Sequence, residues 1–306
     1  MKAKNTFALV LALSLIFPFT FTACSNEDEP NQEVIRTDES NYEAFVVGSS
    51  LSASGIEYAV EKDIYTVKEK TDPTAPPTVT LTISGYTLEG TYSHSRMNLP
   101  NNYYKHIYYG RNSIHELYLD DSGQITAFFW PDLRTESKKK DEMELTEEEC
   151  LKIAKDFILN TVSAKVNLDE YVVRQTEEQA DNYWFVFTKH INGFATIDEA
   201  RVRVSKNGYV YSYSSTMFGR ISAEDMPKLD QNKLTKTIEN KLDTIYQEVK
   251  GKFAAVKYEE PKLRLMLLDD GTPAVYCSVT VRFEIGKGGS ISDLVSMVIL
   301  SKTTSP

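Results

Sequence analysis

The segment LTEEECLKIAKDFILN, residues 145–160, decides the predicted fold. Thr146 and Glu149 have the spacing of a capping box, which marks the start of a helix. One apolar face of that helix follows at helical spacing and consists of Cys150, Ala154, Phe157 and Ile158. The segments after this helix alternate like strands and end in EARVRVSKNGYVYSYSS, residues 199–215. We therefore expect a helix that covers one face of an antiparallel sheet.

The Asn207-Gly208 pair within residues 199–215 is a strong hairpin signal. With these two residues as the loop, residue 204 is expected to face 211 and residue 202 to face 213. Val202, Val204, Tyr211 and Tyr213 then share one face. We expect the tyrosines to pack in the core under the helix, with an exposed aromatic binding strip as the alternative.

A second stretch repeats the pattern. KLTKTIENKLDTIYQEVKG, residues 233–251, predicts a helix that ends at Gly251, with an apolar face formed by Leu234, Ile238, Leu242, Ile245 and Val249. Three strand-like segments follow it, PKLRLMLLDDG, PAVYCSVTVRFEIGKGG and SDLVSMVILSK. The predicted fold class is α+β, mostly antiparallel β, with two repeated helix-plus-antiparallel-sheet modules.

The region before the first helix is predicted to be rich in β-strands. In PTVTLTISGYTLEGTYS, Val79, Leu81 and Ile83 alternate with threonines, as in a half-buried strand. TESKKKDEM, within residues 135–143, is charged and has no apolar periodicity, which is typical of a linker. The predicted organisation is a signal peptide (1–23), an acidic tether (24–41), a β-rich domain (42–134), a linker (135–143), and modules at 144–220 and 221–306.

The helix opening at residue 145 and the glycine-centred hairpin at 199–215 resemble the PepSY family of extracellular modules. The resemblance covers residues 144–215 and, more loosely, 230–302. PepSY modules occur in propeptides of thermolysin-like metallopeptidases and as repeats in bacterial lipoproteins, so the resemblance implies inhibition or regulation of a peptidase and brings no catalytic residues. A helix on an antiparallel sheet is also the cystatin-like plan, so the fold alone does not select a function.

The first thirty residues predict export and lipid attachment. Lys2 and Lys4 precede an apolar run from Phe7 to Phe21, which is too short to span a bilayer as a stable helix. Phe-Thr-Ala-Cys at 21–24 resembles a bacterial lipobox, with Phe21 where Leu is usual. The resemblance implies that Cys24 carries fatty acyl chains such as palmitate, and two or three chains hold a protein at a membrane durably. A cleaved signal with an unmodified thiol is the alternative.

The residues after Cys24 predict where the anchored protein lies. SNEDEP and residues 31–41 are polar and acidic and bury too little apolar surface to fold, so we expect a tether. A serine followed by an acidic cluster resembles a surface-export signal of some diderm bacteria. The predicted location is the outer membrane, facing the exterior.

Charge and cysteine content limit the partners. Without residues 1–23, 32 basic residues face 44 acidic ones, a net charge near −12 that repels nucleic acid.

Besides Cys24, the chain has only two cysteines, Cys150 and Cys277. Both lie in apolar patterns, so we expect buried thiols, with a disulfide as the alternative.

No motif predicts catalysis, a metal or a cofactor. His115 and Glu116 begin a zinc-peptidase pattern, but position 119 is Leu and the segment alternates like a strand. His94, His106 and His190 lack metal-ligand spacing. Asp120-Asp121 and Asp269-Asp270 precede glycines, which is typical of turns. An enzyme with a dispersed active site remains an alternative.

The strongest binding candidate is an aromatic cluster near residues 103–111. Its members, with the tryptophan at the end of the next strand pair, are Tyr103, Tyr104, His106, Tyr108, Arg111 and Trp130. Aromatic faces suit sugar rings or peptide side chains, while hydroxyls and Arg give directional bonds. Cross-strand packing of aromatic side chains is the alternative.

The predicted function is therefore a lipid-anchored cell-envelope protein with a non-enzymatic binding role. The expected partner, besides the membrane, is a secreted peptidase or a glycan, the latter bound as by an accessory surface lipoprotein.

Overall fold

The computed structural model describes residues 41–47, 59–62, 64, 67–98, 104–110, 114–135, 144–162, 166–179, 181–216, 218–268, 270–286 and 288–302. Cys24 and the predicted signal peptide, and almost all of the predicted tether and linker, lie outside these residues. Of the described residues, 51% lie in strands and 19% in helices. None of the described helices has the length and apolarity needed to cross a membrane.

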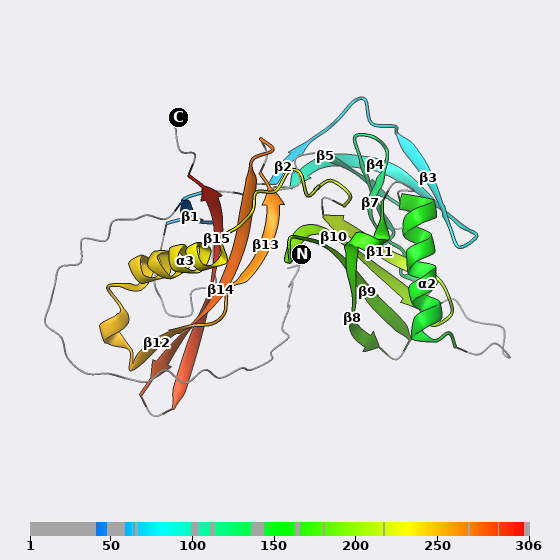
Figure 1. Cartoon of the computed structure of the whole chain (residues 1–306). Helices are drawn as coiled ribbons and strands as arrows, with labels where there is room; N and C mark the ends of the chain where they lie inside the picture. The colour runs from blue at the N-terminus through cyan, green and yellow to red at the C-terminus, as the bar shows by residue number, and fades with distance from the viewer. Residues whose placement is uncertain are drawn as a thin grey trace, which may run out of the picture. The chain divides into compact units, whose positions relative to one another are not determined.

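The described strands form a single mixed sheet of 15 (Figure 1). They are β1 (Tyr42–Val46), β2 (Val67–Lys70), β3 (Thr78–Ile83), β4 (Tyr86–Asn98), β5 (Tyr104–Tyr109), β6 (Glu116–Asp120), β7 (Ile125–Phe129), β8 (Tyr171–Gln179), β9 (Asn182–Ile191), β10 (Phe194–Ser205), β11 (Val210–Thr216), β12 (Ala255–Tyr258), β13 (Lys262–Leu267), β14 (Pro273–Ile285) and β15 (Gly289–Ser301). The α-helices are α1 (Asp132–Thr135), α2 (Glu147–Phe157) and α3 (Gln231–Tyr246). Shorter turns of helix are η2 (Ile158–Val162), η3 (Leu168–Glu170) and η4 (Lys250–Lys252).

The predicted α+β class with two repeated helix-plus-sheet modules is wrong, because the strands continue from one predicted module into the next. The main path of the sheet runs β1-β15-β14-β13-β10-β11-β7-β6-β5-β4-β2. β11 pairs with β7, and β10 pairs with β13 in the only parallel contact among the described strands. β1 pairs with β15, so the first and last described strands are neighbours. The fold is mostly β, and the predicted domain boundaries remain predictions.

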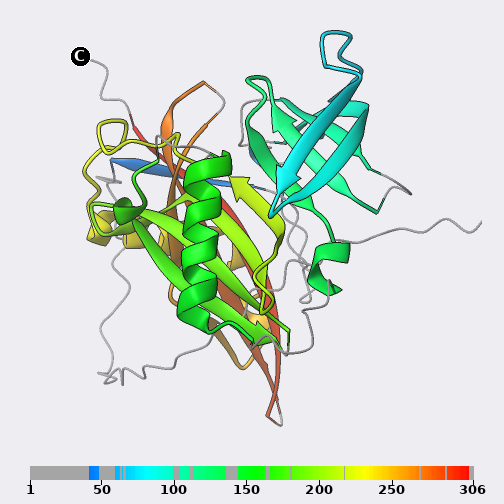
Figure 2. The ribbon, with the colours of Figure 1, turned by 90° about the vertical axis from the view of Figure 1, so that its right-hand side faces the viewer.

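Helix α2 begins as predicted. The Thr146 side chain accepts a hydrogen bond from the Glu149 backbone N–H, and the Glu149 side chain accepts one from the Thr146 backbone, which completes the capping box. Cys150, Ala154 and Phe157 are buried, and Ile158 is buried in the π-turn η2. Figure 2 shows α2 lying across the strands coloured in the same greens. Its apolar face joins a core that contains Phe185, Val202 and Tyr213.

Helix α3 ends earlier than predicted. It runs from the N-cap Asp230 to Tyr246, and the chain then tightens into turns in which Val249 N–H donates to the Tyr246 carbonyl. These shorter bonds end the α-helix before Gly251. The predicted face is nevertheless largely buried, and it packs into a second core with strands β13–β15. Cys150 and Cys277 are buried free thiols in different cores, as expected.

The hairpin between β10 and β11 differs from the prediction by one residue. Val202 pairs with Tyr213 as predicted, but Val204 pairs with Val210 instead of Tyr211 because of a β-bulge. Ser205 N–H donates to the Tyr209 carbonyl, and Gly208 adopts φ +88°, so the loop has three residues, Lys206 to Gly208. Tyr211 and Tyr213 are buried, which confirms their predicted core position.

Candidate functional site

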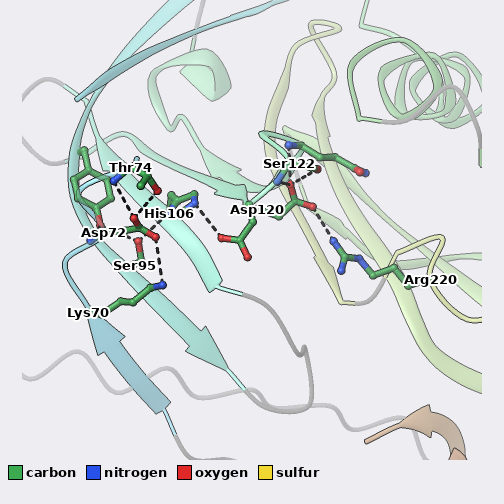
Figure 3. Close-up of polar contacts among 11 residues, drawn as sticks. Lys70, Asp72, Thr74, Ser95, His106, Asp120, Ser122 and Arg220 are labelled. Atoms are coloured by element: carbon green, nitrogen blue, oxygen red, sulfur yellow. Dashed lines mark hydrogen bonds and ion pairs between the residues drawn. The ribbon is translucent and has the colours of Figure 1, made fainter. Parts of the chain in front are cut away.

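A buried polar network joins β4, β5 and β6 (Figure 3). Ser95 Oγ and His106 Nδ1 share a hydrogen bond of 2.7 Å, and His106 Nε2 lies 3.2 Å from Asp121 Oδ1. Strand pairing produces this arrangement, because Ser95 lies opposite His106, which lies opposite Leu119 near the end of β6. The first turn residue after β6 is Asp121, so its carboxylate meets the outer nitrogen of the imidazole.

The network continues to the turn before β3. The Tyr92 hydroxyl shares a 2.8 Å hydrogen bond with Ser95 Oγ and accepts one from the Asp72 backbone N–H at 2.9 Å. Hydrogen bonds from the Thr74 side chain and backbone, and then the nearby Lys70, lower the pKa of Asp72 to about 2. This end of the network therefore holds the turn at residues 72–75 against β4.

A serine, a histidine and an aspartate in series suggest nucleophilic catalysis, but the geometry does not provide for it. A nucleophilic serine needs an oxygen that faces the substrate, with the base on its other side. Ser95 is 0% exposed, and its oxygen already contacts both Tyr92 and His106. The network thus stabilises the curved sheet by satisfying buried polar groups.

Asp120, at the end of β6, connects the β6–β7 turn to the loop that contains Arg220. Asp120 is 2% exposed; its Oδ1 accepts hydrogen bonds from Ser122 and from the Gln124 backbone, as predicted for a turn-forming aspartate. Its Oδ2 lies 2.8 Å from Arg220 Nη2 (Figure 3). Lys105 lies opposite Asp120 in the sheet. Burial and then repulsion by Arg220 lower the pKa of Lys105 to about 8, with Asp120 opposing the effect.

Arg220 borders a pocket of about 340 Å³, which we call the Arg220 pocket. Its lining residues are Gln124, Val166, Asn167, Glu170, Tyr171, Lys189, Phe218, Gly219 and Arg220. Both cations of the lining lie beside a carboxylate: Lys189 Nζ is 2.7 Å from Glu170, and Arg220 contacts Asp120. The rings of Tyr171 and Phe218 contact each other with centroids 5.1 Å apart. The pocket is therefore polar, balanced in charge and bordered by aromatic rings.

A buried carboxylate fixes the loop at 218–221. Asp198 Oδ1 accepts hydrogen bonds from the Tyr171 hydroxyl at 2.8 Å and from Gly219 N–H at 3.0 Å, and Oδ2 accepts from Ile221 N–H at 3.4 Å. Burial raises the pKa of Asp198 to about 6, although these hydrogen bonds and Lys189 lower it. Asp198 lies in the β10 bulge between Ala195 and Glu199, so the bulge positions this wall of the pocket.

The described members of the predicted binding cluster lie inside the protein. His106 and Tyr108 share a face of β5, since both rings contact Tyr92. Tyr108 is 0% exposed, and its hydroxyl has no hydrogen-bond partner among the described residues. Trp130 is buried against Tyr86 and His115. Tyr103, Arg111 and the side chain of Tyr104 lie outside the described residues, so a ligand role of the cluster stays a prediction.

Sequence reasoning did not find the Arg220 pocket. Its residues come from the β6–β7 turn, the loop before β8, strands β8 and β9 and the loop after β11, and no motif links them. The sequence held only a weak signal for this pocket. Phe218, Gly219 and Arg220 closely follow the hairpin that was predicted at residues 199–215. Among the described residues, no group of three or more His, Cys, Asp or Glu is placed to hold a metal ion.

Part of the chain matches a known protein family. Residues 109–217 match the family described as the YcdB, YcdC repeated domain. The matched segment spans the end of β5 through β11, including α2, Gln124 and Lys189, and it stops before Arg220. No curated protein and no solved structure matches the chain.

Proposed function

We propose that the protein is a lipid-anchored cell-envelope protein that binds a polar ligand of the glycan class in the Arg220 pocket. The observation that carries this proposal is the lining of that pocket. Asn167, Gln124 and Glu170 offer planar amide and carboxylate groups, and the two cations are balanced by carboxylates. Such a lining suits a neutral ligand with many hydroxyls, because it exchanges hydrogen bonds without leaving an unpaired charge.

Two substitutions test the pocket with little change to the fold. Gln124→Ala removes one amide, while Asn167→Ser removes another and keeps an oxygen for the N-cap bond to Asp169 N–H. Full-length protein in detergent would be titrated with neutral oligosaccharides of different linkage. We expect each substitution to weaken binding about fivefold to tenfold, as for the loss of one hydrogen bond.

Asn232→Ala, on the exposed side of α3, is the matched control and should bind like the unaltered protein. The pocket is excluded as the site if the two pocket variants also retain full affinity. Glycan binding itself is excluded if no neutral oligosaccharide binds the unaltered protein.

Anchoring at Cys24 is a separate part of the proposal. Cells that express the protein would be labelled with a radioactive fatty acid, and label should be lost in Cys24→Ala. Protease treatment of intact cells should then remove the described part of the chain if the protein faces the exterior. Label retained in Cys24→Ala, or full protection from protease, contradicts the respective part.

A second candidate role is regulation of a secreted peptidase. It is favoured by the two features on which the PepSY resemblance rests, the capping box at Thr146 and the hairpin turn at Gly208, both present in the structure. Adding the protein to secreted metallopeptidases from the same cells should inhibit or bind one of them. Absence of both inhibition and a complex removes this candidate.

A further inference from the structure

The face of β8, β9 and β10 that points away from α2 carries a group of cations. Strand register places Arg174 opposite Val186, which lies opposite Arg201, and it places Trp184 opposite Arg203. The alternate residues of these strands, including Phe185, Phe187 and Val202, are buried in the core with α2. We call the opposite surface the basic face; its polar residues are Arg174, Trp184, His190, Glu199, Arg201, Arg203 and Arg264.

Among the described side chains, the basic face carries four arginines and one carboxylate, Glu199; register adds Glu177 opposite Trp184, so the arginines remain in excess. Glu199 is 5% exposed, and it lies 2.6 Å from Arg201 Nε and 3.1 Å from Arg264 Nη1. Arg174 is exposed and makes no ion pair with a described residue. Excess positive charge here contrasts with the net charge of −10 of the whole chain. The basic face therefore complements an anion, which the rest of the surface repels.

Trp184 adds an aromatic ring to the basic face, and this ring orients Arg203. The Arg203 guanidinium lies over the indole ring at 4.2 Å from its centroid. The indole Nε1–H is buried and has no hydrogen-bond partner among the described residues. A bound carboxylate or sulfate offers acceptor oxygens to the guanidinium of Arg203, which lies over the ring.

The effect of the arginines on His190 supports this view of the surface. Burial first, and then Arg174 and Arg264, lower the pKa of the His190 imidazole. Arg174 of β8 and Arg264 of β13 therefore both lie near enough to His190 of β9 to act on it.

We propose that the basic face binds an acidic polysaccharide that carries carboxylate or sulfate groups. Arg174 and Arg201 are two strands apart, about 10 Å, and Arg201 and Arg203 are about 7 Å apart along one strand. Cations spread over such distances fit an extended polymer with repeated charges better than one small anion. Arginine forks bind carboxylate and sulfate in two-pronged geometry, and exposed Val172, 46% accessible, gives a sugar ring an apolar contact at the edge.

The basic face is distinct from the Arg220 pocket. Tyr171 and Lys189 of the pocket pair with each other, and so do Val172 and Thr188 beside them. Successive residues of a strand point to opposite faces, so the two sites lie on opposite sides of β8 and β9. The proposal therefore goes beyond the glycan site in the pocket, and the two are separable by mutation.

The test uses full-length protein in detergent and fluorescently labelled polygalacturonate and heparin, with dextran as the neutral polymer. We expect at least one acidic polymer to bind, and we expect Arg174→Ala to leave any binding of dextran unchanged. Arg174→Ala should weaken binding about tenfold, as expected for the loss of one charge-assisted hydrogen bond, and Arg174→Ala with Arg203→Ala should weaken it further. The dependence of affinity on salt should also become shallower in these variants, a change that lost packing alone does not produce.

Arg282→Ala, which removes an exposed arginine of β14 that is paired with Glu259, is the matched control and should bind normally. Gln124→Ala should also leave acidic-polymer binding unchanged, which separates this face from the pocket. Three results overturn the proposal: no acidic polymer binds, Arg174→Ala binds with unchanged affinity and salt dependence, or poly-glutamate binds while both polysaccharides do not. The last result assigns the face to an acidic protein instead.

Discussion

Replacement of Asp198 by Asn should destabilise the protein at acid pH and stabilise it at neutral pH. The carboxyl of Asp198 is buried in the β10 bulge, and burial raises its pKa from 3.8 to about 6. Between these two pH values the folded protein binds more protons at this group than the unfolded chain does. The free energy of unfolding therefore falls as the pH rises through this interval and is constant above it.

The structure gives the size of this effect. The interval from 3.8 to about 6, at about 1.36 kcal/mol per pH unit, corresponds to about 3 kcal/mol. An asparagine is neutral at every pH, and its oxygen still accepts from Tyr171 and Gly219. Its amide replaces the oxygen that accepts from Ile221 N–H, a loss of about 1 kcal/mol at all pH values. Asp198→Asn should thus be about 1 kcal/mol less stable than the unaltered protein at pH 3.5 and about 2 kcal/mol more stable at pH 7.5.

Urea unfolding followed by circular dichroism at several pH values between 3.5 and 7.5 measures this difference. Asp225→Asn is the control from the neighbouring turn. Hydrogen bonds from the side chain and backbone of Ser222 lower the pKa of Asp225, so its stabilising contribution is lost as the pH falls. The Asp225→Asn difference should therefore change with pH in the opposite direction. A difference between Asp198→Asn and the unaltered protein that is constant with pH would refute the reasoning.

Three further predictions follow from the cores and the polar network. Thr146→Ala removes the capping box of α2 and should lower the free energy of unfolding by about 1 kcal/mol in urea titrations, whereas Thr146→Ser should have little effect. Ser95→Ala leaves the buried His106 Nδ1 without its 2.7 Å partner and should cost about 1–3 kcal/mol; an unchanged urea midpoint would contradict a stabilising network. Burial raises the pKa of the Cys277 thiol to about 12, so it and Cys150 should resist thiol reagents in the folded protein and react in urea, and rapid labelling of both without urea would disprove their burial.

Local structure was largely predictable from the sequence because its causes are local. The spacing of Thr146 and Glu149 fixed the start of α2, and Gly208 marked a turn that needs positive φ. The end of α3 was not predictable from Gly251, because the turns after Tyr246 already form shorter hydrogen bonds. The bulge beside Val204 moved the pairing by one residue, and a bulge has no fixed signature in the residues that form it.

The fold class was mispredicted because long-range strand pairing is made by the backbone. β7 meets β11 and β10 meets β13 through N–H and C=O groups that every residue type provides. The alternation in each strand indicates which residues are buried, but not which strand lies alongside. Two helices with good apolar periodicity therefore suggested two closed modules, whereas both helices cover parts of one continuous sheet.

The same argument explains why His106 was recognised as a notable residue while its role was not. Its place in an aromatic cluster suggested a ligand contact, but Ser95 and Asp121 reach it only through the pairing of β4, β5 and β6. The Arg220 pocket and the basic face depend even more on pairing. Adjacent acids in β10 serve the two sites: Asp198 holds the loop beside Arg220, and Glu199 binds Arg201 and Arg264. In the sequence the two are a plain Asp-Glu pair among 44 acidic residues. The bulge in β10 and the pairing of β10 with β13 place Asp198 at one site and Glu199 at the other. Both sites therefore depend on strand topology more than on any motif.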